Sequence, residues 1–432
     1  MFRQLRDRFD DLRSSLWFIP ALVVIACVGL AAGMIELEDG RHALADGWPR
    51  LFGAGAEGAR ALLSTIAGSM ITVAGVSFSI TVVALTLASS QYTSRVLGNF
   101  MRDRPNQWVL GVFVGVFGYC LVVLRSIRSG DEGSFVPALA VFVGLALAFV
   151  AIGFLIFFIH HIADSIQAAS IIAATARDTI TVIDESFTVR LGDPSDRSQP
   201  VAPDVTAWHP VAATADGYVQ RVDLDALVEL ARRHGRVIRM LRGVGEFATR
   251  GEPLVELGPV APDDALRDGV CDAFAIAKRR TLSQDPGFGI RQLVDVALKA
   301  LSPGVNDTTT AVSCVDFLGA ILAHAIDRRI AEPARWHGGE LRLLPRGATF
   351  ELWVAEAFDQ IRQSAGGNVA VLRRQLEVLT LLLGRTREPE RRDALTLQVH
   401  RVAECSTRTV PAAHDRERLD AARDEALRSS RA

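Results

Sequence analysis

The sequence predicts an α-helical integral membrane protein with about four transmembrane helices, followed by a cytoplasmic α+β region that contains a small, barrel-sandwich-like β module. Two observations carry this prediction. The mean hydropathy of the 432-residue chain is +0.24, which is high for a water-soluble protein. The apolar residues also lie in long uncharged runs before Ile159, whereas most charged residues lie after Arg177. We therefore expect the first part of the chain in the membrane and the second part in water.

Four runs are long enough to cross a bilayer, because a helix needs about 20 predominantly apolar residues to span ~30 Å of hydrocarbon. None of these runs contains Asp, Glu, Lys or Arg. The predicted spans are residues 16–35, 61–88, 108–124 and 135–159. The expected parts of the chain, in order, are an amphipathic leader (1–15), a transmembrane domain (16–160), a helical extension of the fourth span (161–189), a linker (190–204), the β module (205–258) and a helical C-terminal domain (262–432).

The leader and the short loops predict the orientation. The apolar residues of the leader follow helical spacing, which favours a helix on the membrane surface over a plain solvated leader. Together with the second loop, the leader carries more arginines than the first and third loops do. Because arginine-rich loops stay in the cytoplasm, both termini of a four-span protein are expected there. The five cysteines form no CxxC pair, which fits a reducing compartment and argues against zinc.

One face of the second span carries hydroxyl side chains at alternating steps of four and three residues. Its hydroxyl members are Thr65, Ser69, Thr72, Ser79 and Thr86. One interpretation is close helix packing, since small residues let helices approach and hydroxyls bond across the interface. The other is a water-facing wall of a pore or substrate path. Packing is the commoner cause of such a face. None of the four runs has an ionisable residue, which argues against an ion-coupled transporter.

The fourth span continues into the polar region without a proline or glycine, so one continuous helix is expected through residues 161–189. Small and apolar residues keep a four-three spacing typical of a coiled-coil seam. The seam consists of Ile162, Ile166, Ala169, Ala173, Ala176, Ile180, Ile183 and Phe187. A helix of the same chain or the same helix in another subunit can cover it, and self-association is favoured. His160 and Asp164 lie one turn apart at the membrane surface, too few ligands for a metal site.

The β module is predicted from turn residues and alternation between residues 205 and 258. The segments GYVQRVD and VGEFATRGEPLVEL resemble half of a barrel-sandwich hybrid domain, the fold of biotinyl and lipoyl carriers. A carrier requires an attachment lysine, and no lysine occurs between Gly217 and Leu257. We therefore interpret the module as an element for docking or assembly.

Three longer segments indicate a family. They are VSFSITVVALTLASSQYTSRVLGNFMRDRPNQWVLGVFVG, FFIHHIADSIQ and FGIRQLVDVALKALSPGVNDTTTA. Together they resemble the bacterial predicted membrane proteins grouped as domain of unknown function 2254, over essentially the whole chain and in the same order. Thr308 stands where that family usually has proline. The resemblance implies a bacterial inner-membrane location, and it assigns no substrate, cofactor or functional residue.

A polar segment between residues 288 and 310 is a second candidate site. Its members are Arg291, Gln292, Asp295, Asn306 and Asp307. Polar groups near a glycine-rich turn and a helix N-terminus can bind an anion. The alternative, which we favour, is a folded turn in which Asn306 or Asp307 caps the next helix.

The sequence leaves three classes of function. A homo-oligomeric channel or transport-related protein is favoured by the hydroxyl face and the exit helix. The alternative is a membrane-anchored scaffold or sensor that binds a cytoplasmic protein. An enzyme is not expected, because no catalytic triad, phosphate-binding loop or dinucleotide motif is present, and neither a cofactor nor a metal is expected. The expected partners are the lipid bilayer and further copies of the chain; a net charge of −2 argues against nucleic acid.

Overall fold

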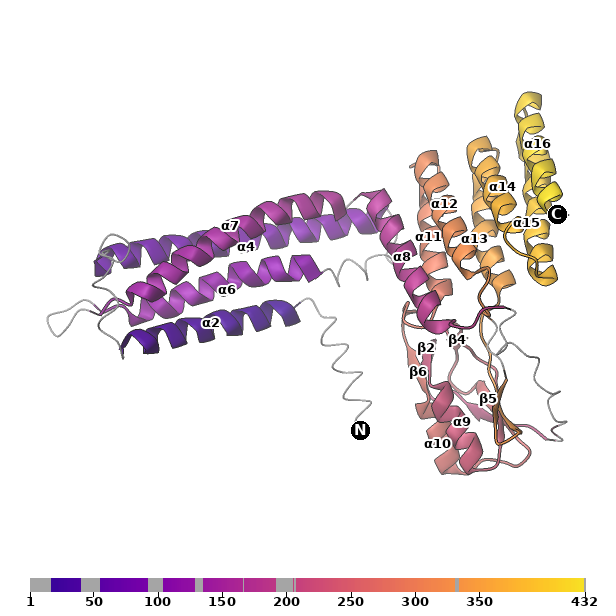
Figure 1. Ribbon diagram of the computed structural model, residues 1–432, viewed down its shortest axis with the longest axis horizontal. Helices are drawn as coiled ribbons and strands as arrows, with labels where there is room; N and C mark the ends of the chain where they lie inside the picture. Colours follow the sequence, from indigo (N-terminus) through magenta and orange to yellow (C-terminus); the bar gives the residue numbers. More distant parts are fainter. Residues whose placement is uncertain are drawn as a thin grey trace. The chain divides into compact units, whose positions relative to one another are not determined.

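The computed structural model describes residues 17–39, 55–91, 104–128, 135–165, 167–191, 205, 207–330 and 334–430. The chain divides into two compact units, Met1–Ser170 and Ile171–Ala432. Figure 1 shows that helices dominate both units and that the strands are confined to a small part of the second. This mixture agrees with the predicted class. The predicted leader and residues 192–204 of the predicted linker lie outside the described residues.

The described part of the first unit contains four long apolar helices. They are α2 (Phe18–Asp39), α4 (Ala56–Gln91), α6 (Arg104–Ser126) and α7 (Ala138–Ser165). Each contains most or all of one predicted span. A fifth helix of the described chain, α12 (Thr308–Ala325) in the second unit, is also long and apolar enough to cross a membrane.

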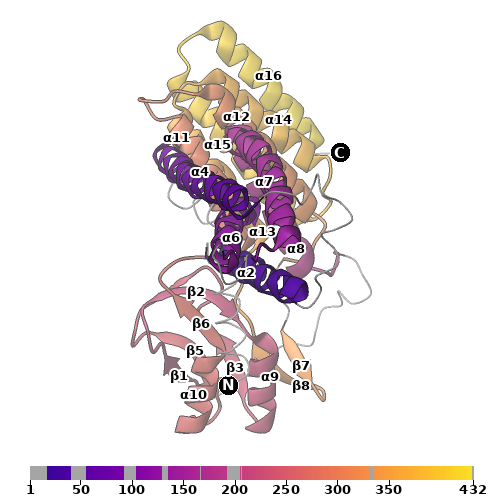
Figure 2. The same cartoon turned by 90° about the vertical axis from the view of Figure 1, so that its left-hand side faces the viewer.

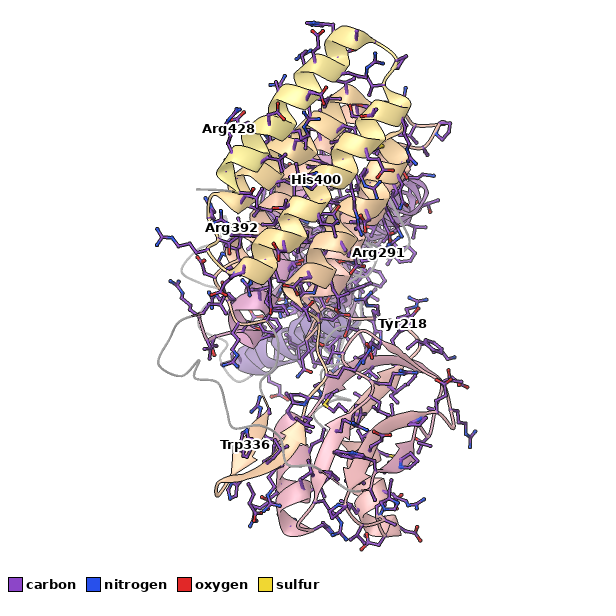
Figure 3. The ribbon with its side chains drawn as sticks, turned by 90° about the vertical axis from the view of Figure 1, so that its right-hand side faces the viewer. Tyr218, Arg291, Trp336, Arg392, His400 and Arg428 are labelled. Atoms are coloured by element: carbon purple, nitrogen blue, oxygen red, sulfur yellow. The ribbon has the colours of Figure 1, made fainter. Side chains whose placement is uncertain are left out.

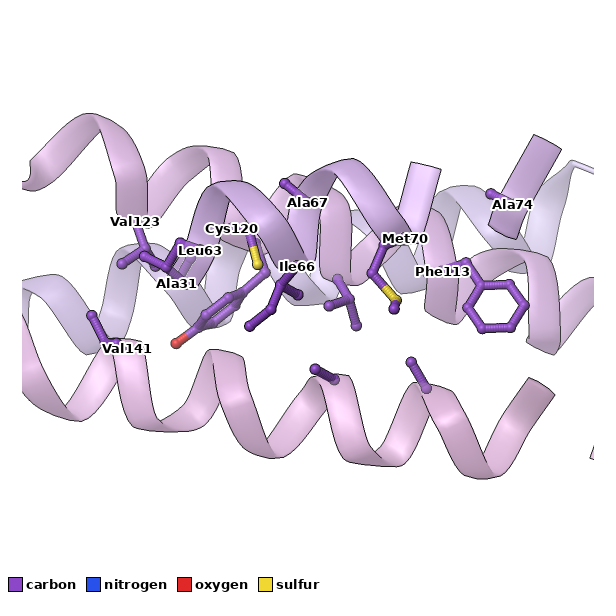
Figure 4. Packing of buried hydrophobic residues seen from close by; sticks show 14 of the residues in the cluster. Ala31, Leu63, Ile66, Ala67, Met70, Ala74, Phe113, Cys120, Val123 and Val141 are labelled. Atoms are coloured by element: carbon purple, nitrogen blue, oxygen red, sulfur yellow. The ribbon is translucent and has the colours of Figure 1, made fainter. Parts of the chain in front are cut away.

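Helix α6 lies at the centre of the first unit. Half of the residues in the most apolar stretch of α6 are buried. In α2, α4 and α7, about a fifth of the residues in the corresponding stretch of each helix are buried. Phe113 and Tyr119 of α6 have no exposed surface. Figure 4 shows Phe113 of α6 near Met70 of α4, within one apolar cluster that all four helices share. The apolar stripe of α6 is thus covered on several sides, whereas the other helices keep an outer face.

Glycines on α6 allow α2 to approach closely. A Cβ added to Gly111 would lie 3.1 Å from the Cα of Pro20, and one added to Gly115 would lie 2.9 Å from the Sγ of Cys27. Small residues four apart on one face typically let two membrane helices pack backbone to backbone. At one end of the unit, the Glu38 carboxylate accepts hydrogen bonds from the first backbone N–H groups of α7. These contacts join α2 to both α6 and α7 within one chain.

The continuous exit helix predicted for residues 161–189 is wrong. Helix α7 ends at Ser165, Gln167 forms a bend, and α8 (Ala168–Ser186) begins after it. The backbone N–H of Gln167 bonds to the carbonyl of Asp164, three residues earlier, and the Ser165 hydroxyl donates to the carbonyl of Ile162. Short-range bonds of this kind compete with the regular helical pattern.

The buried face of α8 lies against α11 (Pro286–Ala300) of the same chain. Ile172, Thr179 and Ile183 of α8 are fully buried. A Cβ added to Gly289 of α11 would lie only 1.9 Å from the Oγ1 of Thr179, so the two helices are in close contact. The predicted seam shares Ile183 with this face, but Ala169 is exposed. Part of the seam is therefore buried within the chain, while self-association of this segment stays a prediction.

Among the described residues of the second unit, eight strands form two sheets. They are β1 (His209–Ala212), β2 (Gly217–Val222), β3 (Val237–Met240), β4 (Phe247–Ala248), β5 (Pro253–Gly258), β6 (Phe274–Ala277), β7 (Arg335–His337) and β8 (Glu340–Leu344). The strand order is β1-β5-β3-β8-β7 in one sheet and β4-β2-β6 in the other. The sheets share one apolar core with α9 (Leu224–Arg233) and α10 (Asp264–Asp272), which lie side by side in Figure 2.

The prediction that residues 262–432 form a helical domain is wrong in part, because this segment also contains strands β6, β7 and β8. Strand β6 pairs with β2, and β8 pairs in parallel with β3, so the module reaches beyond residue 258. Each of these strands has only three to five residues. Such short strands have little apolar alternation of their own and are formed by pairing with distant strands.

The other helices of the second unit pack side by side (Figure 1). Besides α11 and α12 they are α13 (Phe350–Ala365), α14 (Val369–Leu383), α15 (Pro389–Thr409) and α16 (Ala413–Ser429). Phe350, Trp353 and Phe358 of α13 are among the most deeply buried large side chains. Gly319 of α12 allows contact with α14, because a Cβ there would lie 2.5 Å from the Cγ1 of Val378.

Candidate functional site

The hydroxyl face predicted on the second span lies on the outer side of α4. Thr65, Ser69, Thr72, Ser79 and Thr86 are all exposed within the first unit. The opposite face of α4, with Leu63, Ala67 and Ala74, is buried against the other helices. No described helix of the first unit covers the hydroxyl face.

Four of the five hydroxyl groups of this face donate to carbonyls of their own helix. Thr65 donates to the carbonyl of Ala61 at 2.8 Å, Thr72 to Gly68 at 2.8 Å and Thr86 to Val82 at 2.9 Å, and Ser69 donates to Thr65. This arrangement lowers the cost of placing these four hydroxyls in the membrane, because their donors are paired. The oxygen lone pairs still face outward and can accept hydrogen bonds from water or a neighbour.

Two glycines leave this side of α4 open. A Cβ added to Gly68 or Gly75 would meet nothing within 4 Å. The first unit therefore has no internal need for these glycines, in contrast to Gly111 and Gly115 of α6. The hydroxyl face can contact lipid, water or another copy of the chain.

The structure separates the second predicted set into two groups. Arg291, Gln292 and Asp295 lie within α11, whereas Asn306 and Asp307 follow its end. From Arg291 to the last residue of α11 the helix rises by about 13 Å, which separates Arg291 from the second group. Arg291 and Asp295 form an ion pair with 2.7 Å between the guanidinium and carboxylate atoms.

Asp307 is the N-cap residue of α12. Its carboxylate accepts hydrogen bonds from the backbone N–H of Thr310 at 3.0 Å and from the Thr310 hydroxyl at 2.6 Å. These bonds to Thr310 lower the pKa of Asp307 below its ordinary value. Thr308 accepts a hydrogen bond from the side-chain amide of Asn368. This end of the predicted set therefore serves the start of α12.

Replacing Asp307 with alanine is expected to lower the free energy of unfolding by about 1 kcal/mol, because an N-cap acceptor is lost. Asp307→Asn keeps an acceptor and should cost less. Because the pKa of Asp307 is lowered in the fold, its stabilisation is complete above the ordinary value of 3.8 and is lost as the pH falls through the lowered pKa. Thermal unfolding of the full chain in detergent measures the difference, and equal melting of Asp307→Ala and the wild type would contradict it.

Arg291 opens onto a cavity of about 490 Å³ between the helices and the strand loops of the second unit. Figure 3 labels Arg291 on the helical side and Tyr218 on the strand side of this region. A second cavity of about 330 Å³ adjoins it. The residues that line both are Val244, Asp285, Gly347, Ala348 and Trp353.

The larger cavity is rich in charge. Arg280 holds Asp285 through two hydrogen bonds of 2.8 and 3.0 Å. Burial raises the pKa of Glu356, the nearby Arg280 and Arg291 oppose this shift, and Asp285 adds to it. The indole N–H of Trp353 is buried and has no hydrogen-bond partner.

Arg280, Trp353 and Glu356 line the larger cavity but were not predicted as site residues from the sequence. Arg280 lies in the turn before α11, and the other two lie on α13, about seventy residues further along the chain. No motif joins these positions. Only the Asp285-Pro286-Gly287 start of α11 marked this region as a helix N-terminus.

Several long apolar helices in the described part of the chain define a membrane protein. The chain belongs to the family described as predicted membrane protein DUF2254, whose model matches residues 13–380. The resemblance stated from the sequence is thereby confirmed. Its relatives include the uncharacterised proteins Mb1321c of Mycobacterium bovis and Rv1290c of Mycobacterium tuberculosis. Each is 33% identical over 430 residues, which cover 96% of this chain and 81% of the relative. No solved structure matches the chain.

Proposed function

We propose that the protein is a homo-oligomeric membrane channel in which the hydroxyl face of α4 lines the water path. The observation that carries the proposal is the position of this face, opposite the buried side of α4 and open within the chain. Several copies arranged around an axis would place these faces toward one another. Water then supplies the donors that lipid cannot supply to the hydroxyl lone pairs.

Four membrane crossings fit this proposal better than five. Helix α12 has a mean hydropathy of 1.3, whereas α2, α4, α6 and α7 reach 2.1 to 2.9. Its Gly319 packs closely against Val378 of α14, as expected for a core helix of the polar unit. With four crossings, the arginine distribution puts both termini in the cytoplasm of a bacterial inner membrane.

The contact between copies lies on α4 in this proposal. Thr179 on the buried face of α8 already contacts Gly289 of α11, whereas a Cβ added to Gly68 or Gly75 of α4 would meet nothing within 4 Å. Small residues on a membrane helix allow a second helix to approach closely. The path has no fixed charge from this face, so selectivity would come from pore width and hydroxyl groups rather than from a charged ring. The proposal includes no catalytic step.

Cysteine substitution tests the water path. In planar bilayers, a membrane-impermeant cationic thiol reagent is expected to reduce the conductance of Thr72→Cys several-fold, because it would place a charge in the pore. Ala74→Cys is the matched control, since it lies at a similar depth on the buried face of α4. The wild type, with its native cysteines, gives the background. An absence of conductance, or an equal response of both variants, would reject the channel.

The second candidate is a membrane-anchored sensor, and one observation favours it. Helix α8 follows α7 in the chain, and the last residues of α8, with Phe187, line the smaller cavity. The two sheets share one core, which supports the barrel-sandwich likeness and a docking role for the module. A specific protein recovered by the intact membrane protein, and lost when the exposed Phe247 of β4 becomes serine, would support this candidate.

A further inference from the structure

Two glycines shape the larger cavity around Trp353. Gly245 has a positive φ of 85°, and a Cβ there would lie 2.6 Å from the Oδ2 of Asp285. A Cβ on Gly287 would lie 3.3 Å from the Nε1 of Trp353. The space beside the indole N–H thus depends on the absence of a side chain at these positions. The cavity volume of about 490 Å³ lies within the range of small-molecule sites.

The charges around this cavity leave one carboxylate unmatched. Both lining arginines and the other lining acids belong to ion pairs. These pairs are Arg280–Asp285, Arg291–Asp295, Arg346–Glu246 and Arg401–Asp359. Glu356 makes no hydrogen bond or ion pair with any residue that the structure describes, although it is partly buried. An ionised, partly buried carboxylate gains stability from a cation placed beside it.

The indole N–H of Trp353 is the second unmatched group. Trp353 is only 2% exposed, lines both cavities and has a donor without an acceptor in the described chain. A buried donor left unpaired costs about 1–3 kcal/mol. A ligand oxygen in the cavity would recover this free energy.

The smaller cavity adds apolar side chains to a lining that also contains polar ones. Phe187, Met240 and Ile330 contribute to its lining. The ring of Phe187 contacts that of Trp353 edge to face, with 5.7 Å between ring centroids. The two cavities therefore offer a place for an apolar group next to the unpaired donor.

We propose that these cavities bind a small organic ammonium ion that carries a carbonyl oxygen and an apolar side chain. The ammonium group pairs with Glu356, the carbonyl oxygen accepts from the indole N–H of Trp353, and the apolar group enters the smaller cavity. An anion is disfavoured, because Glu356 in the lining of the larger cavity is a carboxylate without an ion pair in the described part of the chain. The assignment is independent of conduction, so its test and that of the channel can fail separately.

Binding of L-leucinamide to the full-length protein in detergent tests the proposal. It combines an ammonium group, a carbonyl oxygen and an isobutyl side chain. N-acetyl-L-leucinamide lacks the ammonium group, and isopentylamine lacks the carbonyl. Isothermal titration is expected to show at least tenfold weaker binding of the acetylated compound, and several-fold weaker binding of isopentylamine. No binding of L-leucinamide at millimolar concentration, or equal binding of the acetylated compound, would overturn the assignment.

Variants identify the contacts. Glu356→Gln is expected to weaken L-leucinamide binding at least tenfold, because it removes the counter-ion while it keeps the shape. Trp353→Phe should weaken L-leucinamide binding several-fold but leave isopentylamine unaffected. Glu351→Gln is the matched control, on the same helix and outside both cavity linings. Unchanged melting temperatures establish that each variant is folded. Wild-type affinity in folded Glu356→Gln would refute the role of Glu356 and with it the proposed site.

Discussion

Gly289→Ala is expected to lower the free energy of unfolding by about 3 kcal/mol or more, among the largest effects of any single substitution in the polar unit. The new Cβ would lie 1.9 Å from the Oγ1 and 2.9 Å from the Cβ of Thr179. Thr179 is fully buried, and its hydroxyl donates to the carbonyl of Thr175, so its side chain has little room to move. Thermal unfolding of the full chain in detergent should show a clear drop in melting temperature.

A second substitution tests whether the clash is the cause. Gly289→Ala combined with Thr179→Ala removes the Oγ1 and Cγ2 atoms and leaves only the contact between the two Cβ atoms. Part of the lost stability should return in this double variant, and the coupling free energy between the two sites should be clearly different from zero. Simple additivity would mean that α8 does not pack on α11 at this point.

Arg391→Met is expected to lower the free energy of unfolding by about 3 kcal/mol, since several buried carbonyl groups would lose their donor. Arg391 of α15 is 6% exposed and donates to the carbonyls of Ala325 and Ile326, at the end of α12, and of Arg328. Its guanidinium also lies over the ring of Phe350, with its central carbon 4.7 Å from the ring centroid. The Arg391 side chain, on α15, therefore supplies hydrogen-bond donors to the backbone carbonyls at the end of α12.

Arg408→Met on the same helix is the control for Arg391→Met. The Arg408 side chain is 66% exposed, and its contact with Glu404 is long, at 3.8 Å. Its removal should change the free energy of unfolding by about 0.5 kcal/mol or less. Arg391→Lys keeps a charge but loses the planar set of donors, so it should fall between the other two variants. Similar melting of Arg391→Met and Arg408→Met would show that the buried contacts are unimportant.

The membrane helices could be predicted from the sequence because hydropathy is a local property. Each predicted span overlaps one apolar helix, and the helix ends differ from the predicted ends by a few residues. The bend at Gln167 could not be predicted, since it involves neither proline nor glycine. Its bonds to Asp164 and Ile162 use residue types that also occur inside regular helices.

Features of the second unit that depend on adjacent residues could be predicted from the sequence, whereas features that depend on distant residues could not. Strand β8 exists through its parallel pairing with β3, about a hundred residues earlier, so no local pattern marks it. The cap at Asp307 follows from adjacent residues and was one of the two roles considered. The cavity of Arg280 and Glu356 joins separate elements, and only the fold brings them together.

The length of α4 has a consequence for the lipid surroundings of the protein. Its 36 residues, Ala56–Gln91, make a straight helix of about 54 Å, whereas the bilayer interior is ~30 Å thick. The excess requires a strong tilt or segments that protrude beyond the acyl chains. Hydrophobic mismatch costs a fraction of a kcal/mol per Å, so acyl-chain length sets the tilt of this helix. Bilayer thickness therefore affects the orientation of α4, the helix that carries the hydroxyl face.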